Sequence, residues 1–382
     1  MVYRNGASLC GSENLQVGGA DEKDITSAKC RYRATSAEYA RFSKAMDLPQ
    51  QRERVTIDGL GDVRKTLVVN SSSKKTKRKS LYPYKKIKNY KWNAPYNIEQ
   101  AKKRIEKYSL ESRIQAVRDK IKKYGIKEEY IHEAGKAIMD EISIAYDISD
   151  KNMGRYLELK KKFEENINNN NNNIDTLYNE IYSLNVIENI PEMHALQLKS
   201  ILSRIRSMGY SKSNYLNIYS NLTGEERAIQ SVLDAYSYLP EDWIKTSLQA
   251  GRYMIKYKSR GCYNASIRLL YTDYTLGTSI HEFVHRMECY RKHLLNIEKI
   301  FYRRRTKGEP LVSLKDIYPK SKYKDYEITR VDSFINPYMG KSYNGALYEL
   351  LTMGIQDAYT LPKILWQDYD MTTWIYGVLA LL

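Results

Sequence analysis

Two of the five histidines in this chain of 382 residues lie four positions apart, in the run His-Glu-Phe-Val-His from His281 to His285. Such a pair can serve one site only if the intervening backbone is helical, because residues i and i+4 then project from the same face. No proline interrupts the flanking residues, and apolar residues recur there at helical spacing. The pattern predicts a helix from about Leu276 to Phe301 that presents both imidazoles on one side.

This spacing is typical of a zinc site. Two imidazoles one helical turn apart can bind one tetrahedral Zn²⁺. Glu282 is rotated about 100° from His281 on a helix, so its carboxylate would lie beside the metal and accept the proton of a water that attacks a carbonyl carbon. The alternative is that His281 and His285 are ordinary histidines of a helix surface or core, and the sequence leaves it open.

A zinc site of this kind needs a third protein ligand, and two common solutions are excluded. Metzincins require Gly and His where this chain has Glu288 and Arg291, and thermolysin-like enzymes place a Glu at the position of Arg304. The sequence favours Glu349, within Leu-Tyr-Glu-Leu-Leu-Thr-Met-Gly. On a predicted helix its carboxylate would share an apolar face, and a carboxylate there needs a partner. That face comprises Ala346, Leu350 and Met353.

Alternatives remain for these residues. Glu349 is also compatible with a buried ion pair to Arg or Lys. The third ligand could instead be Glu288, Cys289 or His293, although the first two lie one turn further along the same helix. Three polar residues lie between the ligand segments and could stabilise an oxyanion: Tyr338, Tyr343 and Arg330. In a chain with 35 tyrosines, an ordinary core or surface position is the favoured interpretation for each.

Composition and pattern divide the chain into four segments. An N-terminal arm and small subdomain (1–70) precede a basic linker (71–96), a helical region (97–237) and a final domain (238–382). In that domain, residues 252–258 and 262–271 favour β-strands, and a turn at 259–261 predicts a hairpin between them. Hydrophobic residues make up 42% and charged residues 28%, which excludes a wholly disordered chain. We expect an α+β, mostly helical fold.

The linker accounts for much of the net charge of +17. It holds nine Lys or Arg residues and no acid between residues 71 and 91, with aromatic residues interleaved. Such a segment can contact nucleic-acid phosphates and stack bases. A solvated connector is the alternative. The residues proposed for nucleic-acid contact are Lys74, Lys75, Lys77, Arg78 and Lys79.

Residues 238–382 resemble the C-terminal zincin-like domain of phage and prophage minor head (head morphogenesis) proteins. The resemblance is carried by Thr-Ser-Ile-His-Glu-Phe-Val-His-Arg-Met-Glu-Cys, by Pro-Tyr-Met-Gly-Lys-Ser-Tyr and by Glu-Leu-Leu-Thr-Met-Gly. It implies zinc as cofactor, bound by His281, His285 and Glu349, with Glu282 as the catalytic residue. It also implies phage head or portal proteins as partners.

Together these observations predict a zinc metallopeptidase that hydrolyses amide bonds in a peptide or protein substrate, with Glu282 as general base. Two rivals remain: a structural head protein whose zincin-like fold is not catalytic, and a basic DNA-binding protein. No apolar leader or span long enough to cross a membrane is visible in the sequence, and four cysteines show no CxxC spacing. We therefore expect a protein of the bacterial host cytoplasm or of the virion, without membrane partners.

Overall fold

The computed structural model describes residues 97–382, apart from residues 169–173, 212–213, 322, 333, 342 and 344–346. The predicted arm, small subdomain and basic linker therefore lie outside the described residues. The structure is 66% helix and 8% strand with a small mixed sheet, which confirms a mostly helical α+β fold. No helix of the described part is long and apolar enough to cross a membrane.

Helices form the first half of the described chain. They are α3 (Ile98–Lys107), α4 (Leu110–Tyr124), α5 (Glu128–Asn168), α6 (Ile174–Ser183), α7 (Pro191–Ser203), α8 (Tyr215–Ser220) and α9 (Glu226–Tyr236). Side chains that satisfy backbone N–H groups set two of the starts: Asn97 Oδ1 accepts from Gln100 N at 3.0 Å, and Ser109 Oγ accepts from Ser112 N at 3.2 Å. The turn after α4 uses Gly125, whose φ of 78° favours glycine.

The second half mixes helices with short strands. Its helices are α10 (Glu241–Gln249), α11 (Leu276–Tyr290), α12 (Lys292–Arg305), α13 (Leu314–Ile317), α14 (Leu350–Thr360), α15 (Pro362–Leu365) and α16 (Tyr369–Leu381), with a 3₁₀-helix η3 (Pro337–Gly340). Its strands are β2 (Tyr253–Tyr257), β3 (Cys262–Asn264), β4 (Leu269–Thr272), β5 (Val312–Ser313) and β6 (Ile328–Thr329), and β1 (Leu222–Gly224) precedes α9.

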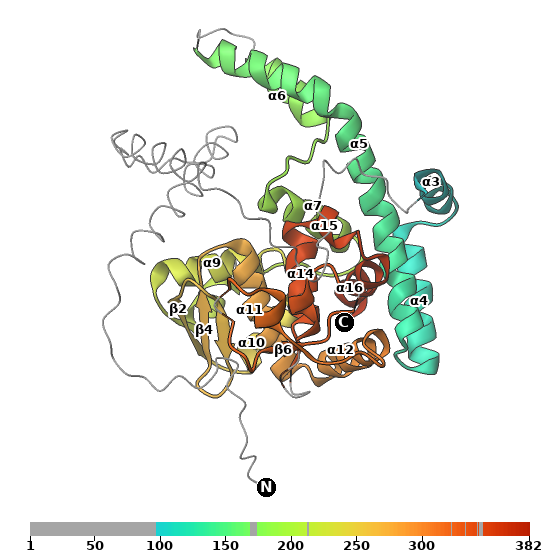
Figure 1. Ribbon diagram of the computed structural model, residues 1–382. Coiled ribbons are helices and arrows are strands. Elements are labelled where there is room, and N and C mark those ends of the chain that lie inside the picture. Colours follow the sequence, from blue (N-terminus) through green and yellow to red (C-terminus); the bar gives the residue numbers. More distant parts are fainter. Residues whose placement is uncertain are drawn as a thin grey trace, which may run out of the picture. The chain divides into compact units, whose positions relative to one another are not determined.

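Helices from both halves share one hydrophobic core. Figure 1 shows α14 and α16 in the middle of the described molecule, between the helical arm of α4 and α5 and the sheet with α9 and α11. The crossing of α5 and α16 requires glycine on both helices: a Cβ on Gly135 would overlap the carbonyl oxygen of Thr373, and one on Gly377 would overlap that of Ile131. The described residues on either side of the expected boundary at 237/238 are thus packed together.

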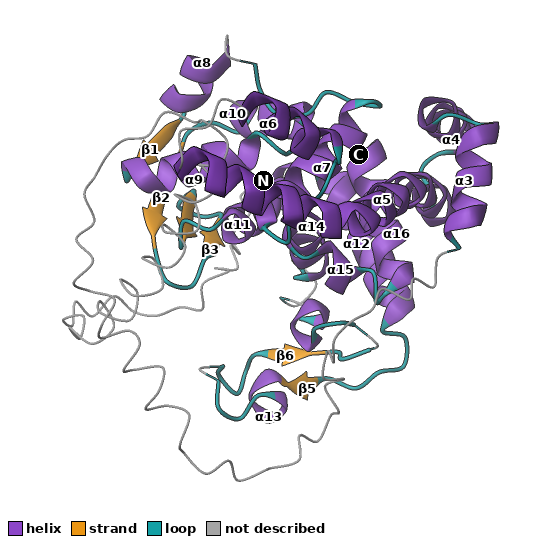
Figure 2. Ribbon diagram, turned by 90° about the horizontal axis from the view of Figure 1, so that it is seen from above, coloured by secondary structure: helices purple, strands orange, loops and turns teal. Residues whose placement is uncertain are grey.

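The main sheet has the strand order β1-β2-β4-β3. The predicted hairpin between β2 and β3 is wrong, because β2 pairs in parallel with β4, whereas β3 pairs antiparallel with β4. Apolar pairing explains the arrangement: Ile255 of β2 lies opposite Leu270 of β4, and both are fully buried. The hairpin is therefore β3–β4, and β3 is the outermost strand on that side among residues 97–382 that the structure describes. Figure 2 shows the separate antiparallel pair of β5 and β6 beside α13.

The helix predicted from Leu276 to Phe301 is two helices, α11 and α12. They meet at Arg291, whose φ of −112° and ψ of 78° are not helical. Its guanidinium reaches Asp242 Oδ2 at 2.7 Å and the carbonyl oxygen of Leu382 at 2.6 Å. These contacts with α10 and the chain end favour the bend over a continuous helix. Residues around the predicted metal motif remain on one unbroken helix, α11.

Candidate metal centre

Helix α11 carries the two histidines. It begins after Thr275, whose Oγ1 accepts a hydrogen bond from Thr278 N at 3.2 Å. The helix packs against α9, α14 and the sheet, so its side chains are largely buried. The side chain of His281 is 12% exposed and that of His285 is 4% exposed. Their ring centroids lie 4.9 Å apart, as the spacing of four residues on one helix requires.

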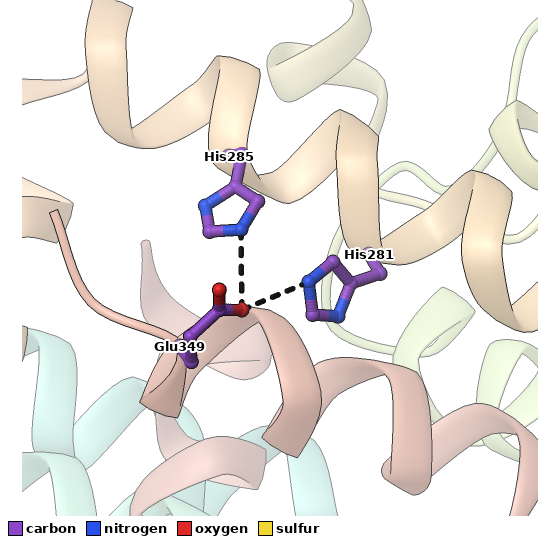
Figure 3. Close-up of side chains that lie close together, drawn as sticks. All are labelled: His281, His285 and Glu349. Atoms are coloured by element: carbon purple, nitrogen blue, oxygen red, sulfur yellow. Dashed lines mark ion pairs between the residues drawn. The ribbon is translucent and has the colours of Figure 1, made fainter. Parts of the chain in front are cut away.

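Glu349 completes a three-residue cluster with them. Its Oε2 lies 3.0 Å from His281 Nε2 and 3.3 Å from His285 Nε2 (Figure 3). Glu349 does not lie on a helix face as the sequence predicted. It immediately precedes α14, with a φ of −102° and a ψ of 0°, and its backbone N–H donates to the Lys341 carbonyl oxygen at 3.3 Å. Because Glu349 lies at the N-terminal end of α14, its carboxylate can face α11.

The far nitrogens of both rings are also engaged. His281 Nδ1 donates to Gln356 Oε1 at 3.1 Å, and His285 Nδ1 donates to Glu288 Oε2 at 2.8 Å. Because both partners are acceptors, each Nδ1 carries a proton, and each Nε2 is left to face Glu349 Oε2. Histidines that bind zinc are commonly held by such a second hydrogen bond. Glu288 therefore binds the Nδ1 side of His285, away from Glu349, and is not one of the three clustered ligand residues.

Further contacts connect Glu288, the partner of His285, to the start of α14. Glu288 lies against Glu298 of α12, and Glu298 Oε1 accepts from Leu351 N at 2.7 Å. Both carboxyl groups are buried, which raises their pKa well above the usual range. The two groups connect α11 and α12 to the turn that holds Glu349. The sequence offered no signal for this link beyond two acidic residues within apolar helices.

Glu282 is buried beside the cluster, with only 4% of its surface exposed. Burial raises the pKa of Glu282, although the nearby charges of His281 and His285 oppose that increase. Its Oε2 has no hydrogen-bond partner among the described residues. A buried carboxylate oxygen without a partner is costly, and Glu282 Oε2 is thus available to a water molecule bound beside the cluster.

Tyr338 and Tyr343 both reach the cluster. Each hydroxyl donates to Glu349 Oε1, at 2.9 Å and 2.6 Å. Burial raises the pKa of each phenol well above its usual range, and the charge of Glu349 adds to the effect. Both tyrosines therefore remain neutral hydrogen-bond donors beside the histidines.

Arg330 was also proposed here, and its side-chain hydrogen bonds are made with other groups. Its Nε donates to the Glu309 carbonyl oxygen at 3.1 Å, and its Nη1 lies 3.4 Å from the Tyr302 hydroxyl. The cations that do approach the cluster are Arg260 and Lys341, at 3.5 Å and 3.3 Å from the Tyr338 hydroxyl. Sequence reasoning missed both, although Lys341 belongs to the quoted Pro-Tyr-Met-Gly-Lys-Ser-Tyr run.

The cluster has the donors that zinc prefers. Two imidazole nitrogens and one carboxylate oxygen lie within 4.8 Å of one another, and a His₂Glu set is a common catalytic zinc site. Burial alone would raise the pKa of Glu349, but the two imidazoles outweigh it and hold the pKa well below its usual range. The carboxylate is therefore ionised, as a metal ligand must be. The residues present fit a zinc ion.

Comparisons with protein-family models, curated proteins and solved structures find no significant match to this chain. The residues proposed for nucleic-acid contact, Lys74, Lys75, Lys77, Arg78 and Lys79, lie outside the described residues.

Proposed function

We propose that this chain is a zinc-dependent metallopeptidase that hydrolyses amide bonds in a peptide or protein substrate. The observation that carries the proposal is the combination of three convergent ligand atoms with an unpartnered, buried carboxylate oxygen on Glu282. A structural zinc site is normally closed by four protein ligands, whereas a catalytic one has three and keeps a position open. The described residues supply three.

The side chains have separate roles in this proposal. Zinc held by His281, His285 and Glu349 would lower the pKa of a water molecule towards about 7 and polarise the substrate carbonyl. Glu282 would accept the proton from that water as its oxygen attacks the carbonyl carbon, and then donate it to the departing amine nitrogen. Burial raises the pKa of Glu282, which makes it better suited to hold a proton between these steps.

Tyr338 and Tyr343 would bind the oxygen on which negative charge develops. Both are neutral donors that already point at the ligand Glu349, so a short rotation about the side-chain bonds would redirect one of them to the substrate oxygen. The residue before β3, Gly261, lies against Glu282, so a peptide bound beside this turn would reach the proposed general base. These contacts support a peptide as substrate.

The biological setting is proposed from the resemblance described above. It favours a phage or prophage minor head protein acting in the bacterial cytoplasm or in the virion, with phage head or portal proteins as partners and DNA as a further partner of the basic linker. A non-catalytic head protein with the same fold is the principal rival, and a DNA-binding protein with an incidental metal site is the second.

Metal content and hydrolysis together test the proposal. Elemental analysis should find about one zinc per parent chain and a loss of zinc in His281→Ala. Hydrolysis of a fluorogenic peptide library should depend on the metal and on Glu282. Full zinc retention in His281→Ala would overturn the site, and zinc binding without hydrolysis of any peptide would favour the non-catalytic rival.

A further inference from the structure

Arg260 extends from the turn between β2 and β3 towards the segment that precedes Glu349. Its Nη2 lies 3.1 Å from Glu327 Oε1, and its guanidinium lies over the ring of Tyr323, 5.6 Å from the centroid. The Arg260 side chain is 56% exposed. A Cβ on the next residue, Gly261, would lie 2.7 Å from Glu282 Oε1, so this turn touches the proposed general base directly.

The charges around Arg260 do not balance. Glu327 is shared with Lys341, whose Nζ lies 2.8 Å from the same Oε1, and both of these side chains are buried. Glu327 Oε2 accepts a further hydrogen bond from Lys324 N at 2.9 Å. Glu327 therefore keeps a cation and a backbone donor without Arg260. The excess positive charge of this group lies on Arg260, the exposed member.

The contact between Arg260 and Glu327 can be exchanged at low cost. Arg260 is the exposed partner of this pair, and Glu327 would keep Lys341 if Arg260 turned away. Both described hydrogen bonds of Arg260 use Nη2, and its Nε–Nη1 edge has no partner among the described residues. A guanidinium binds a carboxylate best through two parallel hydrogen bonds, which the present contacts do not provide. A carboxylate on a bound peptide could supply them.

We propose that Arg260 is a specificity residue that binds a carboxylate of the peptide lying in the site, either an Asp or Glu side chain or a free C-terminus. The inference rests on the proposed function for the nature of the ligand. Arg260 lies beside Glu282 and Tyr338, so the recognised carboxylate falls within a few residues of the bond to be cleaved. The protein thus selects acidic peptides.

The test measures binding separately from cleavage. The full chain carrying Glu282→Gln, with zinc present, is titrated into fluorescent alanine-based heptapeptides whose ends are blocked. The first set places a single Glu at each position in turn, and the second set has Gln in place of that Glu, so that each acidic peptide has a neutral twin. A third set has a free C-terminal carboxylate and no Glu. Fluorescence anisotropy is compared with and without Arg260→Gln. Lys258→Gln is the matched control, because Lys258 is an exposed cation in the same turn that lies over Tyr271.

We expect at least one Glu or free-carboxylate peptide to bind 10-fold or more tightly than its neutral twin. Arg260→Gln should reduce that preference to within about twofold, and Lys258→Gln should leave it intact. The set that shows the preference identifies the source of the carboxylate. Equal binding of acidic and neutral twins, or a preference that survives Arg260→Gln, would overturn the inference.

Hydrolysis of the same peptides by the parent chain distinguishes this inference from the proposed function. Acidic binding that depends on Arg260 without any cleavage would count against the peptidase and support the role of Arg260. Cleavage of acidic and neutral twins at equal rates would support the peptidase and count against Arg260 as the specificity residue.

Discussion

Replacing Glu349 by Gln tests the proposed ligand set most directly. The Glu349 carboxylate is buried, with its Oε2 against both Nε2 atoms and its Oε1 accepting from both tyrosine hydroxyls. Glu349→Gln replaces an anionic ligand with a neutral amide, whose oxygen can still accept from the tyrosines. We expect the zinc dissociation constant to rise by at least about 10-fold, equivalent to about 1.4 kcal/mol.

Competition with a chromophoric chelator measures that change. Glu188→Gln is the matched control, because Glu188 also accepts hydrogen bonds from a tyrosine and a lysine, Tyr156 and Lys160. It is not part of the metal cluster, and its variant should bind zinc as the parent does. An unchanged zinc affinity in Glu349→Gln would refute the reasoning and show that another residue is the third ligand.

Three further predictions concern catalysis, packing and pH. Glu282→Gln should keep zinc and the fold but lose hydrolysis by about 10²–10⁴-fold in a peptide assay, because it removes the proton acceptor; loss of zinc as well would mean that Glu282 binds the metal. Gly377→Ala should lower the free energy of unfolding, measured in urea, by at least about 1–3 kcal/mol, because its Cβ would overlap a backbone carbonyl. Gly154 lies in open space on α5, so Gly154→Ala should increase the free energy of unfolding by up to about 1 kcal/mol. Equal effects of the two alanines would contradict the close helix crossing. Burial lowers the pKa of His194 to about 4. The unfolded chain, with a pKa of about 6.5, binds that proton first, so the free energy of unfolding should fall by up to about 3 kcal/mol as the pH decreases from about 6.5 to about 4. Urea titrations across this range should show the decrease, and a His194→Gln variant with the same decrease would assign it to other groups.

Local pattern was sufficient to predict the helix that carries His281 and His285. The i and i+4 spacing fixes both rings on one face in any helix, and the apolar positions around them require that helix to be buried. The helical character of residues 98–236 and the last helices of the chain followed from the same periodicity. Glu349 was selected because a lone carboxylate in an apolar segment needs a partner, and the structure brings it to both histidines.

The residues around this cluster could not be predicted in the same way. Gln356 supports His281 only because α14 packs across α11. Glu288 lies three residues after His285 on the same helix, but Glu298 reaches it only because the chain bends into α12 at Arg291. From the sequence, Arg330 was proposed for the site and Arg260 was not singled out. Only the fold brings Arg260 towards Tyr338 and directs Arg330 towards Glu309.

Strand pairing also separates what the sequence predicts from what the tertiary structure decides. The sequence by itself indicated strands at residues 252–258 and 262–271, because their side chains favour β structure, and β2, β3 and β4 lie there. It did not determine that β2 pairs with β4 in parallel or that β3 pairs antiparallel with β4. Local preferences act over a few neighbouring residues, whereas the choice of partner strand depends on which arrangement buries Ile255 and Leu270 together against the helices. That choice is made by the whole core, and it decides which side chains meet at the metal centre.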